Sequence, residues 1–285
     1  RVLSVDNTAL MPSSNLLYGI PMLAGYDSME LATTADLVQQ LSTDERGAYF
    51  IKEIRSFDRT EALPLARLLG VRYLLSPVDL PPPYELILDG PTKVYEDTGA
   101  APRFLAATSA RYLREPAARL AFLGSAEFDP GIAVLEGLPR MDDADPLSPA
   151  TRATLEAGKS VSVAPLDGQL ESYGDTEITL RVSAGPSALD PAYDTALGDT
   201  RPDLQGTLPA LAILTDAWDA GWIAELDGEP VEVLRVDHGL RGVWVPPGDH
   251  ELVFRYEPRA LSTGLLLGLL GLAGTLALLL LRPRR

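Results

Sequence analysis

The chain has 285 residues, 46% of them hydrophobic, with 24 Lys and Arg against 40 Asp and Glu, a formal net charge of −16. This hydrophobic fraction supports a packed core and excludes a disordered chain, while the acidic balance argues against binding of nucleic acid, whose affinity depends on cationic contacts to phosphate. The absence of cysteine from the sequence excludes a disulfide scaffold, a thiolate zinc site and a cysteine nucleophile.

The first segment, residues 1–135, mixes helical and extended patterns and predicts a small mixed α/β unit. A short strand opens it. The stretch 15–31 contains Gly19, Pro21 and Gly25, which predict a loop with turns rather than a helix.

Helical spacing begins after this loop, with Thr34 as a candidate N-cap. A second helix is expected to end near Gly70 and to lead into a buried strand over residues 71–75. Two alternating segments separated by Gly90 and Pro91 predict a β-hairpin.

A change of pattern follows this unit. Residues 136–159 are polar and rich in proline, and they predict a linker. The hydrophobic period then becomes two, so that residues 160–258 predict an antiparallel β-sandwich with a tight hairpin turn at Asp227-Gly228. Within it, residues 185–207 are rich in Gly, Pro and Asp and predict a mobile insertion.

The last part of the chain, residues 260–281, has no charged side chain and predicts a transmembrane helix, because at about 1.5 Å per residue it matches the thickness of the hydrocarbon layer. Gly264 and Gly268 fit either a helix-packing face or a lipid-facing helix that tolerates glycine. The basic tail 282–285 predicts a cytoplasmic C-terminus and an extracytoplasmic acidic region. The expected fold class is α+β: the mixed unit, the sandwich and one C-terminal transmembrane helix.

Motifs for catalysis or metal binding are weak in this sequence. His250-Glu251 does not extend to a zincin motif, because Phe254 stands where the second histidine would be. Asp143 and Asp145 match a DxD pattern, but they lie in the predicted linker, where a solvated acidic run is the favoured interpretation. We therefore expect no catalytic residue, metal ion or cofactor in this chain.

All three tryptophans lie close together near the end of the predicted sandwich. Trp218, Trp222 and Trp244, with Arg241, are residue types that suit a carbohydrate-binding platform. Packing in the core is the favoured alternative, because Trp fills the cores of many β-sandwiches. A contact with sugar or with the lipid interface is the other possibility.

The region 214–264 resembles the C-terminal end of the YfhO family of bacterial multi-pass membrane proteins. The resemblance rests on Asp-x-Trp, Gly-Trp, Asp-Gly, Arg-Gly-Val, Val-Pro-x-Gly-x-His and Tyr-x-Pro before an apolar segment. Two further blocks, 15–31 and 68–77, fit the same family in the same order.

This resemblance implies a GT-C type, glycosyltransferase-like parent protein in the bacterial cell membrane, which would use polyprenyl-phosphate sugars to glycosylate cell-envelope polymers. Its catalytic half would precede this chain, so no catalytic residue carries over and the chain alone is not expected to be an enzyme. The implied partners are the lipid bilayer, upstream transmembrane helices of the same protein, a polyprenyl-phosphate sugar and a cell-wall polymer.

The resemblance also makes one loop a candidate for substrate contact, with an ordinary structural turn as the alternative. The candidate loop residues are Asn15, Tyr18, Tyr26 and Asp27.

The alternative function is a non-enzymatic, membrane-anchored β-sandwich module that binds envelope glycans or a partner protein.

Overall fold

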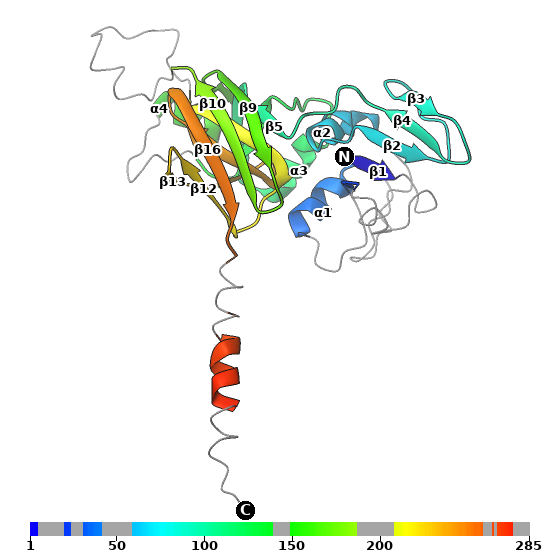
Figure 1. Cartoon of the computed structure of the whole chain (residues 1–285). Coiled ribbons are helices and arrows are strands. Elements are labelled where there is room, and N and C mark those ends of the chain that lie inside the picture. The colour runs from blue at the N-terminus through cyan, green and yellow to red at the C-terminus, as the bar shows by residue number, and fades with distance from the viewer. Residues whose placement is uncertain are drawn as a thin grey trace, which may run out of the picture.

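The computed structural model describes residues 1–4, 20–23, 31–41, 59–138, 149–186, 208–258, 264 and 267–275. These residues form a mixed α and β fold with three β-sheets and short helices (Figure 1), which confirms the mixed class. The elements are β1 (Val2–Ser4), α1 (Ala32–Gln39), η2 (Thr60–Ala62), α2 (Leu63–Leu68), β2 (Tyr73–Ser76), β3 (Glu85–Leu88), β4 (Lys93–Glu96), β5 (Phe104–Ala106), β6 (Ser109–Tyr112), α3 (Pro116–Leu123), β7 (Ile132–Leu135), α4 (Pro149–Glu156), β8 (Ser160–Ser162), β9 (Leu166–Tyr173), β10 (Glu177–Ala184), β11 (Ala210–Ala217), β12 (Trp222–Leu226), β13 (Glu229–Val231), β14 (Leu234–Val236), β15 (Leu240–Val245) and β16 (Gly248–Tyr256).

The N-terminal unit is built on a four-stranded sheet of order β1-β2-β4-β3. The predicted hairpin is confirmed as the antiparallel pair β3 and β4, and Gly70, with a φ of 69°, follows α2 as expected. The prediction of Thr34 as an N-cap was wrong. The cap is Leu31, whose carbonyl accepts the first helical hydrogen bond from Ala35 at 3.0 Å, so α1 starts before both threonines.

The seven-stranded sheet, of order β5-β11-β15-β14-β7-β6-β8, is the middle layer of the molecule. Strand β11 is buried on both faces: Leu211 and Ile213 enter the core shared with α1, α2 and the N-terminal sheet, and Ala212 and Leu214 enter the sandwich core. Side chains alternate between the two faces of a strand, so two-sided burial requires the near-continuous apolar run seen in β11.

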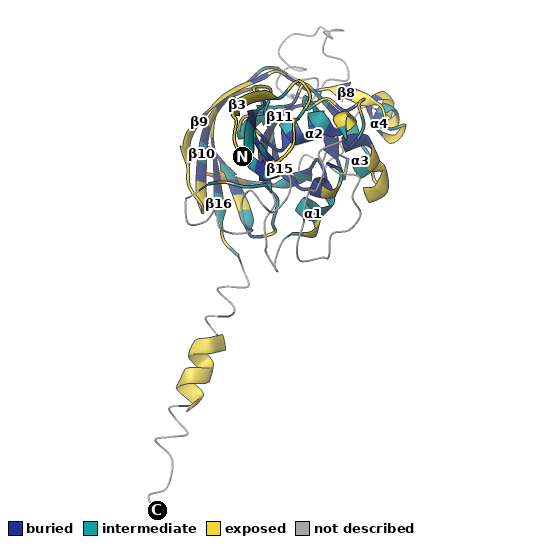
Figure 2. Cartoon of the chain, turned by 90° about the vertical axis from the view of Figure 1, so that its right-hand side faces the viewer, coloured by how far each residue is buried: buried dark blue, intermediate teal, exposed yellow. Residues whose placement is uncertain are grey.

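The five-stranded sheet, of order β13-β12-β16-β10-β9, packs against the middle sheet, so the two sheets form a sandwich. The antiparallel sandwich predicted over residues 160–258 is confirmed only in part, because the middle sheet also takes β5, β6 and β7 from the N-terminal segment, and β6 runs parallel to β7. Its inward face includes Leu180 from β10 and Phe254 from β16, both fully buried. The predicted turn at Asp227-Gly228 is confirmed: both residues have positive φ, 53° and 84°, and they join the antiparallel pair β12 and β13. Figure 2 shows the buried residues concentrated between the layers.

The middle sheet combines strands from both sides of the predicted linker. Strand β11 pairs with β5, with Leu214 opposite Phe104, and β6 pairs with β8. In addition, α4 lies inside the range 136–159. The boundary drawn there does not separate two sheets, because pairing between strands so far apart in sequence leaves no local pattern. Residues 139–148 and 187–207, which include most of the predicted insertion, lie outside the described ranges.

Strand β16 ends at Tyr256, and the described helical residues 267–275 of the C-terminal segment lie away from the body (Figure 1). Residue 264 and residues 267–275 are helical and exposed. In the part of the chain that the structure describes, no helix is long and apolar enough to cross a membrane, so the transmembrane helix predicted over 260–281 is not confirmed.

Candidate binding site

An apolar groove lies at the end of the sandwich from which the C-terminal segment departs. It has a cavity volume of about 390 Å³ and is formed by β12, β13 and the segments beside them. Its walls include Trp218, Trp222, Ile223, Val231 and Val233. The position of the groove is fixed by strand register, because Trp222 pairs with Tyr256, the last residue of β16.

A short turn sets the positions of the two tryptophans. The Asp219 carboxylate accepts a hydrogen bond from the Gly221 N–H at 2.8 Å, and the Trp222 N–H donates to the Asp219 carbonyl at 3.1 Å. Gly221 is required here because a Cβ would come within 2.7 Å of the Tyr256 ring. The turn therefore directs both indoles to one end of the sandwich.

Each indole is held by specific contacts. The Trp218 indole N–H donates to the Val233 carbonyl at 3.2 Å. The Trp222 ring has the Arg241 guanidinium 3.8 Å from its centroid and the Tyr256 ring 5.2 Å away, centroid to centroid. Both rings are partly exposed, so each offers aromatic surface in a fixed orientation.

The structure brings together three of the four sequence-predicted residues in the sandwich. Trp218 and Trp222 line the groove, and Arg241 lies beneath Trp222. Trp244 lies on the opposite face of β15 and packs against the core shared with the N-terminal unit. Side chains two positions apart on a strand point to the same face. Arg241 and Trp244 are three positions apart, so their side chains point to opposite faces of β15. The four loop candidates, residues 15, 18, 26 and 27, lie outside the described residues.

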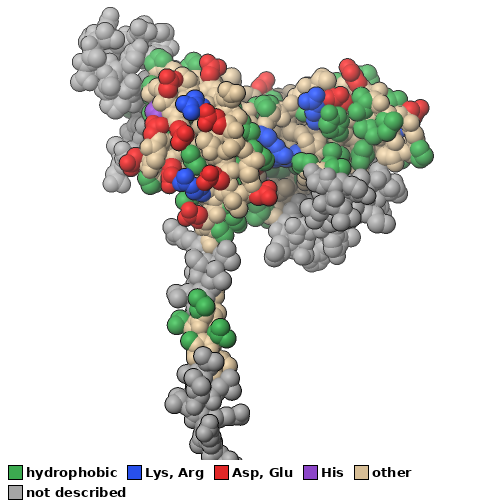
Figure 3. All heavy atoms as spheres, in the orientation of Figure 1, with side chains coloured by type: hydrophobic (Ala, Val, Ile, Leu, Met, Phe, Trp, Pro, Cys, Tyr) green, Lys and Arg blue, Asp and Glu red, His purple; other side chains and the backbone are tan. Residues whose placement is uncertain are grey.

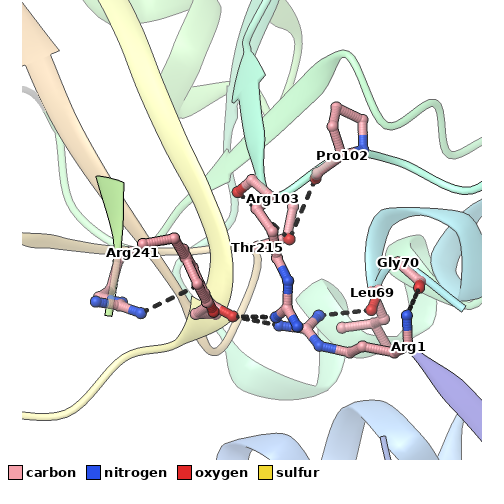
Figure 4. Close-up of polar contacts among 9 residues, drawn as sticks. Arg1, Leu69, Gly70, Pro102, Arg103, Thr215 and Arg241 are labelled. Carbon is pink, nitrogen blue, oxygen red and sulfur yellow. Dashed lines mark hydrogen bonds and ion pairs between the residues drawn. The ribbon is translucent and has the colours of Figure 1, made fainter. Parts of the chain in front are cut away.

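Behind the groove, Arg241 belongs to an ionic cluster centred on Asp216, which we call the Asp216 cluster; Figure 4 shows its three arginines, Arg1, Arg103 and Arg241. Arg1 and Arg103 both donate to Oδ1 of Asp216, the latter at 2.5 Å. Tyr173 donates its hydroxyl to Oδ2 at 3.0 Å, and Arg241 Nη2 lies 3.4 Å from the same oxygen.

Burial shapes the acid–base chemistry of this cluster. Removal from water lowers the pKa of Arg241 to about 10, although the Asp216 carboxylate opposes that change. Burial also lowers the pKa of the Arg1 guanidinium and raises the pKa of the Tyr173 phenol. Both arginines stay protonated at neutral pH, so the cluster is cationic.

Sequence reasoning missed most of the Asp216 cluster. Asp216 and Arg241 fall within the motif-bearing segment, but Arg1, Arg103 and Tyr173 come from three distant stretches of the chain. No spacing rule links them, because the contact arises only where β1, β5 and β9 meet β11.

The two histidines make structural contacts. His238 Nε2 lies 3.1 Å from the Asp36 carboxylate of α1, and His250 Nδ1 lies 2.7 Å from that of Asp227. Within the described ranges, no group of three or more His, Asp or Glu side chains could hold a metal ion.

The outer face of the five-stranded sheet carries charged side chains of both signs, as Figure 3 shows over the sandwich. Cross-strand pairs join Arg181 to Glu171 at 2.8 Å, and Arg255 to Glu177 at 3.0 Å and Glu225 at 2.5 Å. Opposite charges on this face are paired with one another in water, so it has the character of a solvated surface.

Comparison of the chain with protein-family models, with curated proteins and with solved structures found no match. The fold and the site therefore define its class: a mixed α and β protein with an aromatic groove at one end of a β-sandwich and a cationic cluster behind it. The likeness to the YfhO family stays a sequence-based prediction.

Proposed function

We propose that the chain is the extracytoplasmic, acceptor-side accessory region of a membrane glycosyltransferase-like protein, and that its groove binds a saccharide of a cell-envelope polymer. The observation that carries the proposal is the position of the groove, at the end of the sandwich where the chain passes into the apolar segment. Catalysis belongs, in this proposal, to the upstream part of the parent protein, with a polyprenyl-phosphate sugar as donor.

The chemistry of the groove supports saccharide binding. Trp218 and Trp222 offer fixed, partly exposed indole faces, and sugars present apolar C–H faces that pack on aromatic rings. The Glu225 carboxylate, which is paired with Arg255 through Oε2, lies at the edge of the groove, and its remaining acceptor positions can receive hydrogen bonds from sugar hydroxyls. An apolar wall with a few polar groups is the usual composition of a small-ligand site.

The membrane part of the proposal rests on residues 260–281. The described portion of this segment is helical, and its leucines are exposed: Leu267 by 62% and Leu272 by 67%. Exposed leucines on a charge-free helix are favourable in lipid and costly in water. Trp222 and Tyr256 then lie beside the lipid surface, where such amphipathic rings are enriched. On this reading the basic tail is cytoplasmic.

A second candidate function is a non-enzymatic, membrane-anchored module that binds envelope glycans by itself. The observation that favours it is that, among the described residues, those lining the groove all fall between 218 and 233. Such a groove needs no upstream segment to be complete. Strong binding by the isolated chain would favour this second function, and weak binding that strengthens with the parent protein would favour the accessory role.

The test is a calorimetric titration of the full chain, held in lipid nanodiscs, with oligomers of N-acetylglucosamine and with teichoic acid fragments. We expect Trp222→Ala to weaken binding by about fivefold or more, because a buried aromatic anchor contributes over 1 kcal/mol. Trp222→Phe should keep much of the affinity.

Trp244→Phe is the matched control, since Trp244 lies on the other face of β15. Equal losses in the Trp222→Ala and Trp244→Phe variants, with folding intact, would contradict the proposed groove. Absence of binding to the unchanged chain, alone and within the parent protein, would overturn the saccharide proposal.

A further inference from the structure

The Asp216 cluster lies where all three sheets meet. Asp216 is on β11 and Arg241 on β15 of the middle sheet, Tyr173 ends β9 of the five-stranded sheet, and Arg1 adjoins β1 of the N-terminal sheet. The register between β11 and β15 shifts between Leu214 and Ala217, so a β-bulge includes Asp216. Bulges redirect side chains next to functional sites, and here the bulge turns the carboxylate toward the junction.

The cluster carries more positive than negative charge. The guanidinium groups of Arg1, Arg103 and Arg241 converge on the single carboxylate of Asp216, and among the residues that the structure describes this leaves two positive charges uncompensated. The guanidinium groups of Arg1 and Arg103, which both contact Oδ1 of Asp216, repel each other because they are close together and partly buried. Such repulsion is relieved by a further anion.

The other arginines that form ion pairs within the described ranges are better matched. Arg67 has Asp97 to itself, in a bidentate pair at 2.8 and 3.0 Å, and Arg255 has two carboxylates. Even where Arg119 and Arg235 share Glu136, the ratio is two to one. Three arginines on one carboxylate is therefore the largest imbalance among the described ion pairs.

Arg241 shows the shortage of acceptors directly. Its side chain is 3% exposed, and within the described residues its Nε and Nη1 atoms have no hydrogen-bond partner. A buried guanidinium with unsatisfied donors is costly unless an acceptor enters. Because Arg241 is also held against Trp222, it is fixed in place and ready for such an acceptor.

The cluster can be reached from solvent. The Arg103 side chain is 27% exposed and Tyr173 is 46% exposed. Figure 4 shows Arg103 and Arg1 converging from different elements while Arg241 approaches from the other side. An anion that enters beside Arg103 meets guanidinium groups and, after a rotation of the hydroxyl, the Tyr173 donor.

We propose that the Asp216 cluster is a binding site for a dianionic phosphate group, as in inorganic phosphate, a phosphomonoester or pyrophosphate. The uncompensated charge matches a dianion, and guanidinium forks bind phosphate oxygens in pairs. Asp216 holds the arginines together when the site is empty, and it disfavours weakly charged anions by repulsion. This inference stands on the cluster alone and does not depend on the saccharide groove.

The experiment uses the full chain in nanodiscs of neutral lipid and measures binding of inorganic phosphate and of pyrophosphate by calorimetry at constant ionic strength. Arg103→Ala is expected to weaken binding by about tenfold or more, since it removes a charge-assisted donor. Arg181→Ala is the matched control, because Arg181 is an exposed, paired arginine on the outer face of the five-stranded sheet. The affinity of this variant for phosphate should equal that of the unchanged chain.

Asp216→Asn separates a phosphate site from a purely structural ion cluster. If phosphate binds, removal of the competing carboxylate should tighten binding several-fold, and phosphate should raise the melting temperature of this variant more than that of the unchanged chain. If the cluster is only structural, the variant loses stability and phosphate restores none of it.

Absence of phosphate binding to the unchanged chain, or equal binding by the Arg103→Ala and Arg181→Ala variants, would overturn the proposal. Should Asp216→Asn fail to fold even with phosphate, the comparison of these two arginine variants decides. Vesicles of phosphatidylcholine with and without phosphatidic acid then distinguish a lipid source of the phosphate from a soluble one.

Discussion

Replacing Asp237 with asparagine should remove a pH dependence of stability that arises from one buried carboxyl group. Asp237 is 1% exposed. Its Oδ1 accepts the Val134 N–H at 2.7 Å, and within the described ranges its Oδ2 has no partner. Asparagine suits the site, because it keeps the Oδ1 acceptor and tolerates the positive φ of 49° at this turn.

The magnitude follows from the two pKa values. Burial raises the pKa of Asp237 from 3.8 to about 7, against the opposing effect of the Val134 N–H. Below pH 3.8 the carboxyl is protonated in both states. As the pH rises from 3.8 to 7, only the unfolded chain ionises, so the free energy of unfolding falls, and the loss is complete above pH 7. Between pH 5 and pH 8 the free energy of unfolding falls by about 2 to 3 kcal/mol through this group.

Urea unfolding of the full chain and of the Asp237→Asn variant, followed by tryptophan fluorescence from pH 5 to pH 8, measures this effect. Other titrating groups are common to both proteins and cancel in the difference. We expect the variant to gain stability relative to the unchanged chain as the pH rises. A difference that is constant with pH, or that shrinks toward pH 8, would refute the reasoning.

Three further substitutions test the packing. Gly228→Ala should cost about 1 kcal/mol, because φ is 84° while nothing lies within 4 Å of the added methyl group, and chemical denaturation measures it. Gly168→Ala should cost about 1 to 3 kcal/mol in the same assay, since its Cβ would lie 2.6 Å from the Phe104 ring; a smaller loss than for Gly228→Ala would contradict that clash. Leu180→Ala should cost about 2 to 5 kcal/mol in the same assay, because Leu180 is fully buried between the two sheets; a loss below 1 kcal/mol would show that this core is not close-packed.

The sequence predicted local structure better than long-range pairing. The turn at Asp227-Gly228 and the hairpin of β3 and β4 were predictable, because turn residues and alternation act over a few positions. The pairing of Leu214 with Phe104 was not, because it joins residues 110 positions apart in the sequence and depends on the whole sheet. The helix start at Leu31 was also missed, since the cap there uses backbone and no capping side chain.

In the candidate site, too, contacts between residues close together in the sequence could be predicted, and contacts between distant residues could not. Trp218, Trp222 and Arg241 lie within one continuous segment, so their proximity had a local signal. Trp244 belongs to the same segment but faces the other core, because strand alternation separates it from Arg241. Arg1 and Arg103 join Asp216 only through the junction of three sheets, for which the sequence offers no pattern.

The most direct test of saccharide binding by this protein is a residue-resolved titration of the groove. The full chain, labelled with 5-fluorotryptophan and held in nanodiscs, would be titrated with envelope saccharide fragments while ¹⁹F NMR follows the three tryptophans. If the groove binds saccharide, the resonances of Trp218 and Trp222 should shift with the same saturation curve, while that of Trp244 stays in place. A shift of Trp244 equal to theirs, or no shift at Trp218 and Trp222 at saturating saccharide, would contradict it.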